Sequence, residues 1–428
     1  MKEIVSQIWH SASARNVGKL LSANIIAQAI GILVYPVLTR MYGAEDFALL
    51  SLFTSIVTVI VLIANGEYHY AIVLPKEESK AKALVFLCML LVAGVAVLLC
   101  LFLPFSRLIA TLFKAPDLAH WLWALPICVA ALGVWNILNY WYIRRAAFTR
   151  ISGYQVTQSV FTACTKIGFG ALGWLQGGMI LATVIAPSFS LILSICLGWK
   201  KHISDLFPIR KIQIGEVAKE YANFPKFNLP RALVNSVGQA LPIWVLTPCF
   251  GLEHMGYLSL AMVAAFVPLN IIARACYQVL YQRIVENVQQ GLSIRTILMK
   301  FTLWTGGIML VGMTIVYIFV PQMVSVLFGE EWNESATIIR CLFPYLILIP
   351  FCGTLCFLSD VFAKQKIAMW MEAGYVAVML CALIIGAHGL TFLDTVSTYA
   401  WIGFTFLSIQ LIWFVSLIWR YEQTLSTH

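Results

Sequence analysis

Three basic residues lie inside or at the edge of long apolar segments, where a charge needs a partner. Lys166 lies near the middle of one segment, and Arg231 and Arg274 lie towards one end of two others. A charge at the centre of a bilayer costs at least about 2.5 kcal/mol unless water or an opposite charge meets it. Ammonium and guanidinium groups bind phosphate and carboxylate groups. The three residues predict a wet, positively charged cavity for an anion; snorkelling of the two arginines to lipid headgroups is the alternative.

Asparagine and glutamine residues accompany these bases at helical spacing. Such residues either meet a polar ligand or form hydrogen bonds between helices, each worth about 0.6 kcal/mol. We expect Asn24, Gln28, Asn235 and Gln239 to contact ligand hydroxyl groups or to adjust helix contacts. Steps of three and four place side chains on one helix face. The stripes are Asn24, Gln28, Gly31, Tyr35 and Thr39; Gln158, Thr162 and Lys166; Asn228, Arg231, Asn235, Gln239 and Pro242; and Asn270, Arg274, Gln278 and Gln282.

Carboxylates are sparse in the apolar segments. Glu67 closes the second segment and Glu372 opens the eleventh, and either could pair with an arginine or take up a cation. In the alignment of the two halves given below, Glu67 falls beside the counterpart of Arg274, so an ion pair between the halves is one prediction. Arg15, before the first apolar core, is a further candidate. We therefore expect Glu67, Glu372 and Arg15 to act in gating or ion pairing.

Motifs of soluble catalysis are missing. The chain has no GxxxxGK[ST], GxSxG or HExxH sequence, and its seven histidines are scattered singly. The eleven cysteines form no CxxC pair and lie in or beside apolar segments, which favours packing over disulfides or metal binding. Loops reach only about thirty residues by the spans we assign, which favours transport over glycan synthesis. We predict no enzyme activity, no cofactor and no metal.

The composition is that of a polytopic membrane protein. Hydrophobic residues make up 61% of the 428 residues and charged residues 11%, with a mean hydropathy of +0.87. Segments of roughly 17 to 25 apolar residues can cross a bilayer as helices. The twelve spans we predict are Val17 to Leu38, Phe47 to Ala64, Ala83 to Leu103, His120 to Tyr140, Gln155 to Leu175, Met179 to Gly198, Leu229 to Phe250, Gly256 to Leu280, Met299 to Val320, Ile338 to Phe357, Ile367 to His388 and Val396 to Trp419.

Lysine and arginine positions predict the orientation. With both termini in the cytoplasm, 23 of the 28 basic residues fall on the cytoplasmic side. Only Arg40, Arg107, Lys114 and Arg340 fall on the other side, and Lys166 lies within a span. The net charge of +9 is thereby explained by topology, so we predict no nucleic-acid partner.

The two halves of the chain are related. Asn24 and Gln28 match Asn235 and Gln239, and a gap of three residues then aligns Tyr42-Gly43-Ala44-Glu45 with Phe250-Gly251-Leu252-Glu253. Six spans per half make the halves parallel, related by an axis along the membrane normal. We predict an all-α fold of about twelve transmembrane helices in two six-helix bundles, residues 1–205 and 206–428, around a central cavity.

Several stretches resemble the bacterial polysaccharide-unit flippases, the O-antigen translocases of the multidrug/oligosaccharidyl-lipid/polysaccharide exporter superfamily. The residues that carry the resemblance are LTRMYGAEDFALLSLF from Leu38, AIVLPKEE from Ala71, NFPKFNLPRALVNSVGQALPIWVLTPCFGLEHMGYLSLAM from Asn223, PLNIIARACYQVLYQR from Pro268 and LFGEEWNESATIIRCLFPYL from Leu327. One departure is Gly66-Glu67-Tyr68-His69, where the family usually reads Gly-Arg/Lys-Tyr-Glu.

The resemblance implies a function at the bacterial inner membrane. An undecaprenyl-diphosphate-linked oligosaccharide would move from the cytoplasmic to the periplasmic leaflet, for lipopolysaccharide assembly, through a cavity that opens alternately to each side. Cationic side chains would meet the diphosphate, and Lys166, Arg231 and Arg274 match that role. Membrane lipids, a polysaccharide polymerase and a chain-length regulator are the further partners expected.

Other functions stay open. A flippase for a capsule, exopolysaccharide or peptidoglycan precursor would share these features. A cation-coupled drug exporter of the same superfamily should line its cavity with carboxylates, a membrane polymerase should carry a large outer loop, and a channel would not need duplicated halves.

Overall fold

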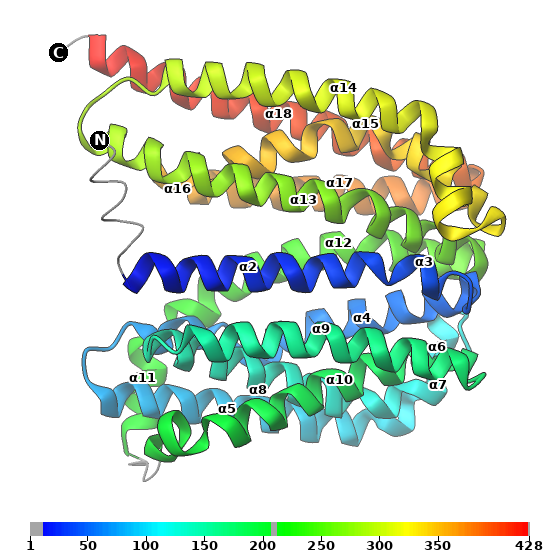
Figure 1. The fold of residues 1–428 in the computed structure, drawn as a ribbon, viewed down its shortest axis with the longest axis horizontal. Helices are drawn as coiled ribbons and strands as arrows, with labels where there is room; N and C mark the ends of the chain where they lie inside the picture. Colours follow the sequence, from blue (N-terminus) through cyan, green and yellow to red (C-terminus); the bar gives the residue numbers. More distant parts are fainter. Residues whose placement is uncertain (1–11, 207–211, 427–428) are drawn as a thin grey trace. The chain divides into compact units, whose positions relative to one another are not determined.

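The computed structural model describes residues 12–206 and 212–426, which form helices and turns without a strand (Figure 1). They fall into two compact units, unit 1 (Met1–Ala240) and unit 2 (Leu241–His428), and each is all-helical. The boundary lies inside one helix, α12. Unit 1 and this helix contain α2 (Ala12–Leu33), α3 (Tyr35–Leu38), α4 (Ala44–Asn65), η1 (Tyr68–Val73), α5 (Glu78–Phe102), η2 (Leu103–Phe105), α6 (Ser106–Leu112), α7 (Leu118–Trp121), η3 (Leu122–Ala124), α8 (Leu125–Arg144), α9 (Phe148–Ala171), α10 (Leu175–Gly198), η4 (Trp199–Ile203), η5 (Ser204–Leu206), α11 (Ile212–Glu220), η6 (Phe224–Asn228) and α12 (Leu229–Phe250).

Unit 2 continues with long helices joined by short turns. Its elements are α13 (Leu252–Gln289), α14 (Arg295–Phe328), η7 (Glu330–Trp332), α15 (Asn333–Leu355), α16 (Leu358–Val361), α17 (Gln365–Gly389) and α18 (Phe392–Ser426).

Every predicted span coincides with a helix. Among the described residues, ten helical segments are long and apolar enough to cross a membrane. The other two predicted spans are α2 with α3, where Ala23–Leu38 is a shorter apolar helix, and α9. These two carry the polar stripes of Asn24 and Lys166. The all-helical transmembrane fold class is therefore confirmed, with a count close to twelve.

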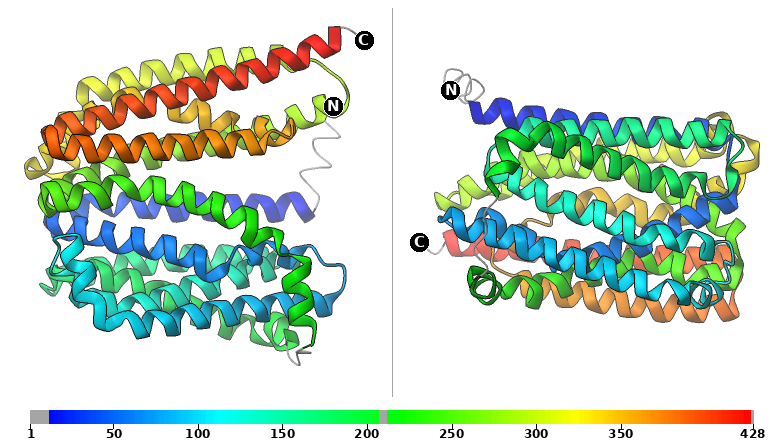
Figure 2. Two further views of the ribbon diagram at one scale, coloured as in Figure 1. Left: turned by 180° about the vertical axis from the view of Figure 1, so that it is seen from behind. Right: turned by 90° about the horizontal axis from the view of Figure 1, so that it is seen from below.

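Helix packing in unit 1 places the two polar spans together. α9 packs against α2 and α10, and the three helices lie side by side in Figure 1 and in the right view of Figure 2. α8 packs against α4, α5 and α10 and forms the buried centre of this unit. Val92 of α5 lies 2.9 Å from where a Cβ of Gly133 in α8 would be, so the absence of a side chain lets these helices approach.

Unit 2 is built around α15. This helix packs against α13, α14 and α18, and α17 packs against α18. One end of the unit is closed by an apolar cluster that includes Phe357, Leu358 and Phe414, all at most 1% exposed.

One matched pair of the sequence repeat has the same place in the helices of both halves. Gly43 and Gly251, which the alignment matches, are both N-cap residues, of α4 and α13 respectively. The division of the repeat at residue 205 stays a prediction, because packing groups the linker helix α11 with α5, which it contacts.

Candidate functional site

Lys166 lies on α9 and is half-buried. Its main-chain oxygen accepts a hydrogen bond of 2.7 Å from the Tyr42 hydroxyl, which holds the turn after α3 against α9. Within residues 12–206 and 212–426, its ammonium group has no ion pair and no hydrogen bond. An ammonium group within a span needs water or an anion. The structure therefore leaves this charge open to a ligand.

Asn24 and Gln28 lie on α2, which packs along α9. Gln28 Nε2 donates to Asn24 Oδ1 at 3.0 Å, and both residues are half-buried. Helix α2, which carries the amide pair, packs against α9, which carries Lys166. After this bond, the Gln28 amide keeps one N–H and two lone pairs, and the Asn24 amide keeps two N–H groups and one lone pair, enough to meet a hydroxyl group.

Asn235 and Gln239 on α12 repeat this geometry. Gln239 Nε2 donates to Asn235 Oδ1 at 2.7 Å, in the orientation found for Gln28 and Asn24. Both residues are exposed, as are Arg231 and Asn228 on the same face. The repeat therefore preserves a side-chain hydrogen bond as well as residue types.

A second exposed polar face lies on α13 in unit 2. Asn270, Arg274 and Gln278 are exposed along one face, while Leu269, Ala273 and Leu280 are buried on the other. Such a face would be unfavourable against acyl chains, so it must meet water or another polar surface. The predicted stripes of α12 and α13 are real helix faces, and whether they share a cavity stays a prediction.

The electrostatics of these faces are positive. Ion pairs among the described residues include Lys80 with Glu220, Lys82 and Arg145 with Glu78, and His254 with Glu334. None of them involves Lys166, Arg231 or Arg274. In the part of the chain that the structure describes, no group of three His, Cys, Asp or Glu side chains could hold a metal ion.

The predicted gating residues have three different settings. Glu67 is 4% exposed, directly precedes η1 and makes no ion pair among the described residues. Glu372 is half-buried on α17. Arg15 lies in α2, but its side chain is outside the part described. Their gating role stays a prediction.

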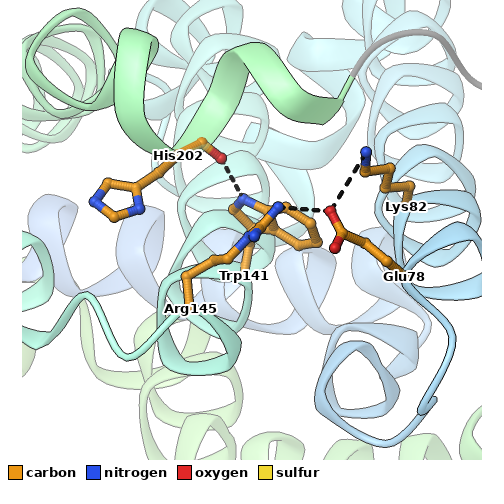
Figure 3. Close-up of polar contacts among 5 residues, drawn as sticks. All are labelled: Glu78, Lys82, Trp141, Arg145 and His202. Atoms are coloured by element: carbon orange, nitrogen blue, oxygen red, sulfur yellow. Dashed lines mark hydrogen bonds and ion pairs between the residues drawn. The ribbon is translucent and has the colours of Figure 1, made fainter.

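Two arginines that sequence reasoning took as topology signals are structural anchors. Arg144 Nη1 donates to the carbonyl oxygens of Ile72 at 3.3 Å and Pro75 at 2.7 Å. Figure 3 shows Arg145, whose Nη2 lies 2.6 Å from Glu78 Oε1 and whose guanidinium carbon lies 4.9 Å from the Trp141 ring centroid. Trp141 Nε1 in turn donates to the main-chain oxygen of His202 at 2.6 Å. In the sequence, Arg144 and Arg145 appear only as two adjacent basic residues at the end of a span. Basic residues that set membrane topology form the same pattern, so the sequence could not distinguish the two roles.

Known proteins place the chain in a family. Residues 37–337, well over half of the chain, match the family model described as polysaccharide biosynthesis protein. The chain belongs to the polysaccharide biosynthesis protein family. No curated protein matches it.

Solved structures show how this family member is folded. A structure described as the lipid II flippase MurJ in an inward closed conformation matches with a TM-score of 0.72 and 13% identity over 95% of this chain and 92% of that one. A multidrug resistance MATE transporter in an inward-facing conformation matches with a TM-score of 0.65 and 16% identity over 94% and 96%. A MOP superfamily transporter from Pyrococcus furiosus, described as having a binding pocket of reverse polarity, matches with a TM-score of 0.63 and 15% identity over 97% of this chain and 98% of that one. This family member is a multi-pass membrane protein with their fold.

Proposed function

We propose that the chain is a flippase that moves an undecaprenyl-diphosphate-linked oligosaccharide, an O-antigen repeat unit, across the bacterial inner membrane. The cargo moves from the cytoplasmic to the periplasmic leaflet by alternating access, with both termini in the cytoplasm. The family assignment supports a role in polysaccharide biosynthesis, and the likeness to a flippase and to exporters supports a fold suited to transport.

The observation that carries the proposal is the set of three unpaired bases. Lys166, Arg231 and Arg274 lie on polar faces and have no ion pair or hydrogen bond within the described residues. Diphosphate oxygens are strong acceptors for ammonium and guanidinium groups. An anion that meets these bases removes the cost of holding a charge without a partner in a span.

The remaining stripe residues suit the sugar part of the cargo. The amide pairs Asn24–Gln28 and Asn235–Gln239 offer donors and acceptors to sugar hydroxyls. The polyprenyl chain is apolar and can stay in the bilayer while the head group crosses. A membrane potential negative inside favours outward movement of an anion by about 2.3 kcal/mol per charge per 100 mV.

The rival drug exporter is disfavoured by the polarity of these faces. A cationic drug would need carboxylates where Lys166, Arg231 and Arg274 stand. Neither stripe on α12 and α13 carries an acidic residue from Asn228 to Pro242 or from Asn270 to Gln282.

The proposal is tested by surface glycan in a strain that lacks its own flippase. We expect the wild-type chain to restore surface O-antigen and Lys166→Ala, Arg231→Ala and Arg274→Ala each to reduce it at equal protein level. Arg107→Ala, an exposed arginine on α6 outside the stripes, is the matched control and should keep wild-type activity.

Parallel strains identify the cargo. Strains deficient in export of a capsule unit or of the peptidoglycan precursor receive the same plasmids. Rescue in one of these strains alone would replace the O-antigen unit by that cargo. Full rescue by all three alanine variants, or resistance to cationic dyes without glycan export, would disprove the proposal.

A further inference from the structure

The turn between α4 and α5 holds a carboxyl group in an unusual setting. Glu67 has a φ of 60°, in the left-handed region that favours glycine, and follows Gly66, whose φ is 53°. A residue with a Cβ is strained there, so the surrounding packing must hold it. The η1 helix that follows is packed against α5 and α8, with Ala71 and Ile72 fully buried.

Buried polar atoms without partners gather at this turn. Oδ1 of Asn65, Oε1 of Glu67 and Nδ1 of His69 are buried and have no hydrogen-bond partner within the described residues. Asn65 is fully buried, and Glu67 and His69 are each 4% exposed. Within the described residues, the carboxyl group of Glu67 has no cation partner and Oε1 accepts no hydrogen bond. A protonated carboxyl group needs an acceptor for its O–H, and Asn65 Oδ1 is an acceptor without a partner at the same turn.

The charged groups near the turn are engaged elsewhere. Arg144 is held by the carbonyls of Ile72 and Pro75, and Lys82 lies 3.4 Å from Glu78. The His69 ring lies tilted against the Tyr70 ring and edge-on to the Tyr140 ring, with centroid distances of 4.3 Å and 5.2 Å. The titratable and charged groups that η1 and its neighbours bring to this turn are Tyr68, His69 and Tyr70 on η1; Tyr140, Arg144 and Arg145 on α8; Glu78, Lys82 and Cys88 on α5; and Lys226 on η6.

Burial sets the protonation states near neutrality. It raises the pKa of Glu67 to about 7 and lowers the pKa of His69 to about 4. His69 is therefore neutral at physiological pH, and Glu67 is poised between its two forms.

The same turn holds the linker helix. Tyr68, the residue after Glu67, donates its hydroxyl to the main-chain oxygen of Ala218 in α11 at 3.0 Å. Lys80 of α5 pairs with Glu220 of α11 at 2.8 Å, and α11 packs on α5. Through η6, α11 leads into α12, the helix of Arg231. The turn therefore contacts α11 directly, and α11 is joined through η6 to a helix of the candidate site.

We propose that Glu67 reversibly binds a proton, and that loss of this proton displaces η1 and loosens its hold on the linker helix α11. The carboxyl O–H bond breaks, the proton passes to water through the small exposed fraction of the side chain, and an unpaired anion remains. This anion is more stable when it is hydrated, so the Glu67 side chain moves towards water. The movement displaces the adjacent residue Tyr68. The consequence for cargo transport rests on the proposed function, whereas the proton site and its effect on α11 do not.

Infrared difference spectroscopy tests the proton site directly. Purified full-length protein is compared at pH 5.5 and pH 8.5, and we expect the carbonyl stretch of a protonated carboxyl group to disappear as pH rises through about 7. Glu67→Gln should lack this band, and Glu77→Gln, which removes an exposed carboxylate of the same loop, should keep it. If Glu67→Gln does not fold, Glu67→Asp should give a band with an altered midpoint. A missing band in wild type, or a band unchanged in every Glu67 variant, would overturn the proton site.

Hydrogen exchange of the α11 amides tests the link to the linker. Variants are compared at equal pH, which removes the intrinsic pH dependence of exchange. At pH 8 we expect α11 to exchange about threefold or more faster in wild type than in Glu67→Gln, because local opening follows loss of the anchoring contact. At pH 5.5 the two should agree. In a Tyr68→Phe background, the difference at pH 8 should vanish. Equal exchange at pH 8 in wild type and Glu67→Gln would overturn the link, whatever the transport assays show.

Discussion

The two units differ in how they treat buried polar groups. In unit 2, the buried residues Ser259, Ser335, Thr354 and Ser359 each donate to a main-chain carbonyl, as do Thr247 and Thr395. In unit 1, buried polar atoms of Asn65, Glu67, His69, Asn139, Tyr154, Gln155 and Ser190 have no partner among the described residues. Unit 1 also holds the open charge of Lys166.

The difference concerns the free-energy cost of buried polar groups. A buried polar group without a partner costs about 1–3 kcal/mol, so unit 1 carries a cost that unit 2 avoids. Groups of this kind persist where a ligand, an ion or a second conformation satisfies them. Within the described residues, unit 1 therefore holds more buried polar atoms than unit 2 that water, a proton or a ligand could satisfy.

The largest expected effect that tests this comparison is the pH dependence of stability in unit 1. The raised pKa of Glu67 stabilises the folded chain below pH 4.5, and this stabilisation is lost as pH rises through about 7. The lowered pKa of His69 has the opposite sign: its contribution is present above pH 6.5 and lost as pH falls through about 4. Each shift corresponds to about 3 kcal/mol.

Single substitutions separate the opposing contributions of Glu67 and His69 to stability. His69→Gln should leave a stability that falls from pH 4.5 to 7, and Glu67→Gln a stability that rises from pH 4 to 6.5. Thermal unfolding in detergent across this range is the measurement. Parallel curves for wild type and both variants would contradict the comparison.

The second prediction compares two basic residues that have no ion pair within the described residues, one in each unit. Lys166 is half-buried and Arg274 is exposed, so the loss of Lys166 should weaken cargo binding more. We expect Lys166→Ala to lower flipping about thirtyfold, equivalent to about 2 kcal/mol, as for a desolvated charge contact. Arg274→Ala should lower it about fivefold, or about 1 kcal/mol, as for an exposed one. Flipping is measured in vesicles with a fluorescent lipid diphosphate oligosaccharide and an external quencher, and an equal or reversed ranking would sink this prediction.

Much of the fold could be predicted from the sequence because lipid imposes simple rules. Apolar length predicts helices, and steps of three and four predict faces, so Asn235 and Gln239 were assigned to one stripe and do share a hydrogen bond. The burial of Glu67 and the main-chain hydrogen bonds of Arg144 could not be predicted in the same way. Glu67 follows Gly66 just past a helix end, where a polar residue usually faces water. Its burial depends on how η1 packs against α5 and α8, and α8 (Leu125–Arg144) is distant from Glu67 in the sequence.

The third effect tests whether polar groups of unit 2 are structural. Glu422 Oε1 accepts hydrogen bonds from Ser293 Oγ at 3.0 Å and from the main-chain nitrogens of Ile294 and Arg295 at 2.8 Å and 2.9 Å. It thereby caps the start of α14, and loss of such a cap costs about 1–2 kcal/mol. We expect Glu422→Ala to lower stability by that amount. Glu286→Ala, which removes one exposed contact with Gln282, should change it by less than about 0.5 kcal/mol. If Glu422→Ala has the same stability as wild type, Glu422 does not stabilise unit 2 as proposed.

The smallest expected effect gives the most direct test of the comparison, because a buried serine is replaced by alanine in each unit. Ser335 in unit 2 donates to the main-chain oxygen of Tyr257 at 3.0 Å, whereas the buried Oγ of Ser190 in unit 1 has no partner in the described chain. Ser335→Ala should destabilise the protein by about 1 kcal/mol, because a satisfied hydrogen bond is lost and a buried carbonyl loses its extra donor. Ser190→Ala removes a desolvated hydroxyl and should be neutral or stabilising by up to about 1 kcal/mol. Denaturation midpoints of the two variants, measured side by side, should therefore shift in different directions or differ clearly in size. If Ser190→Ala destabilises as much as Ser335→Ala, its hydroxyl has a partner in the folded protein, and the contrast between the units narrows to the turn around Glu67.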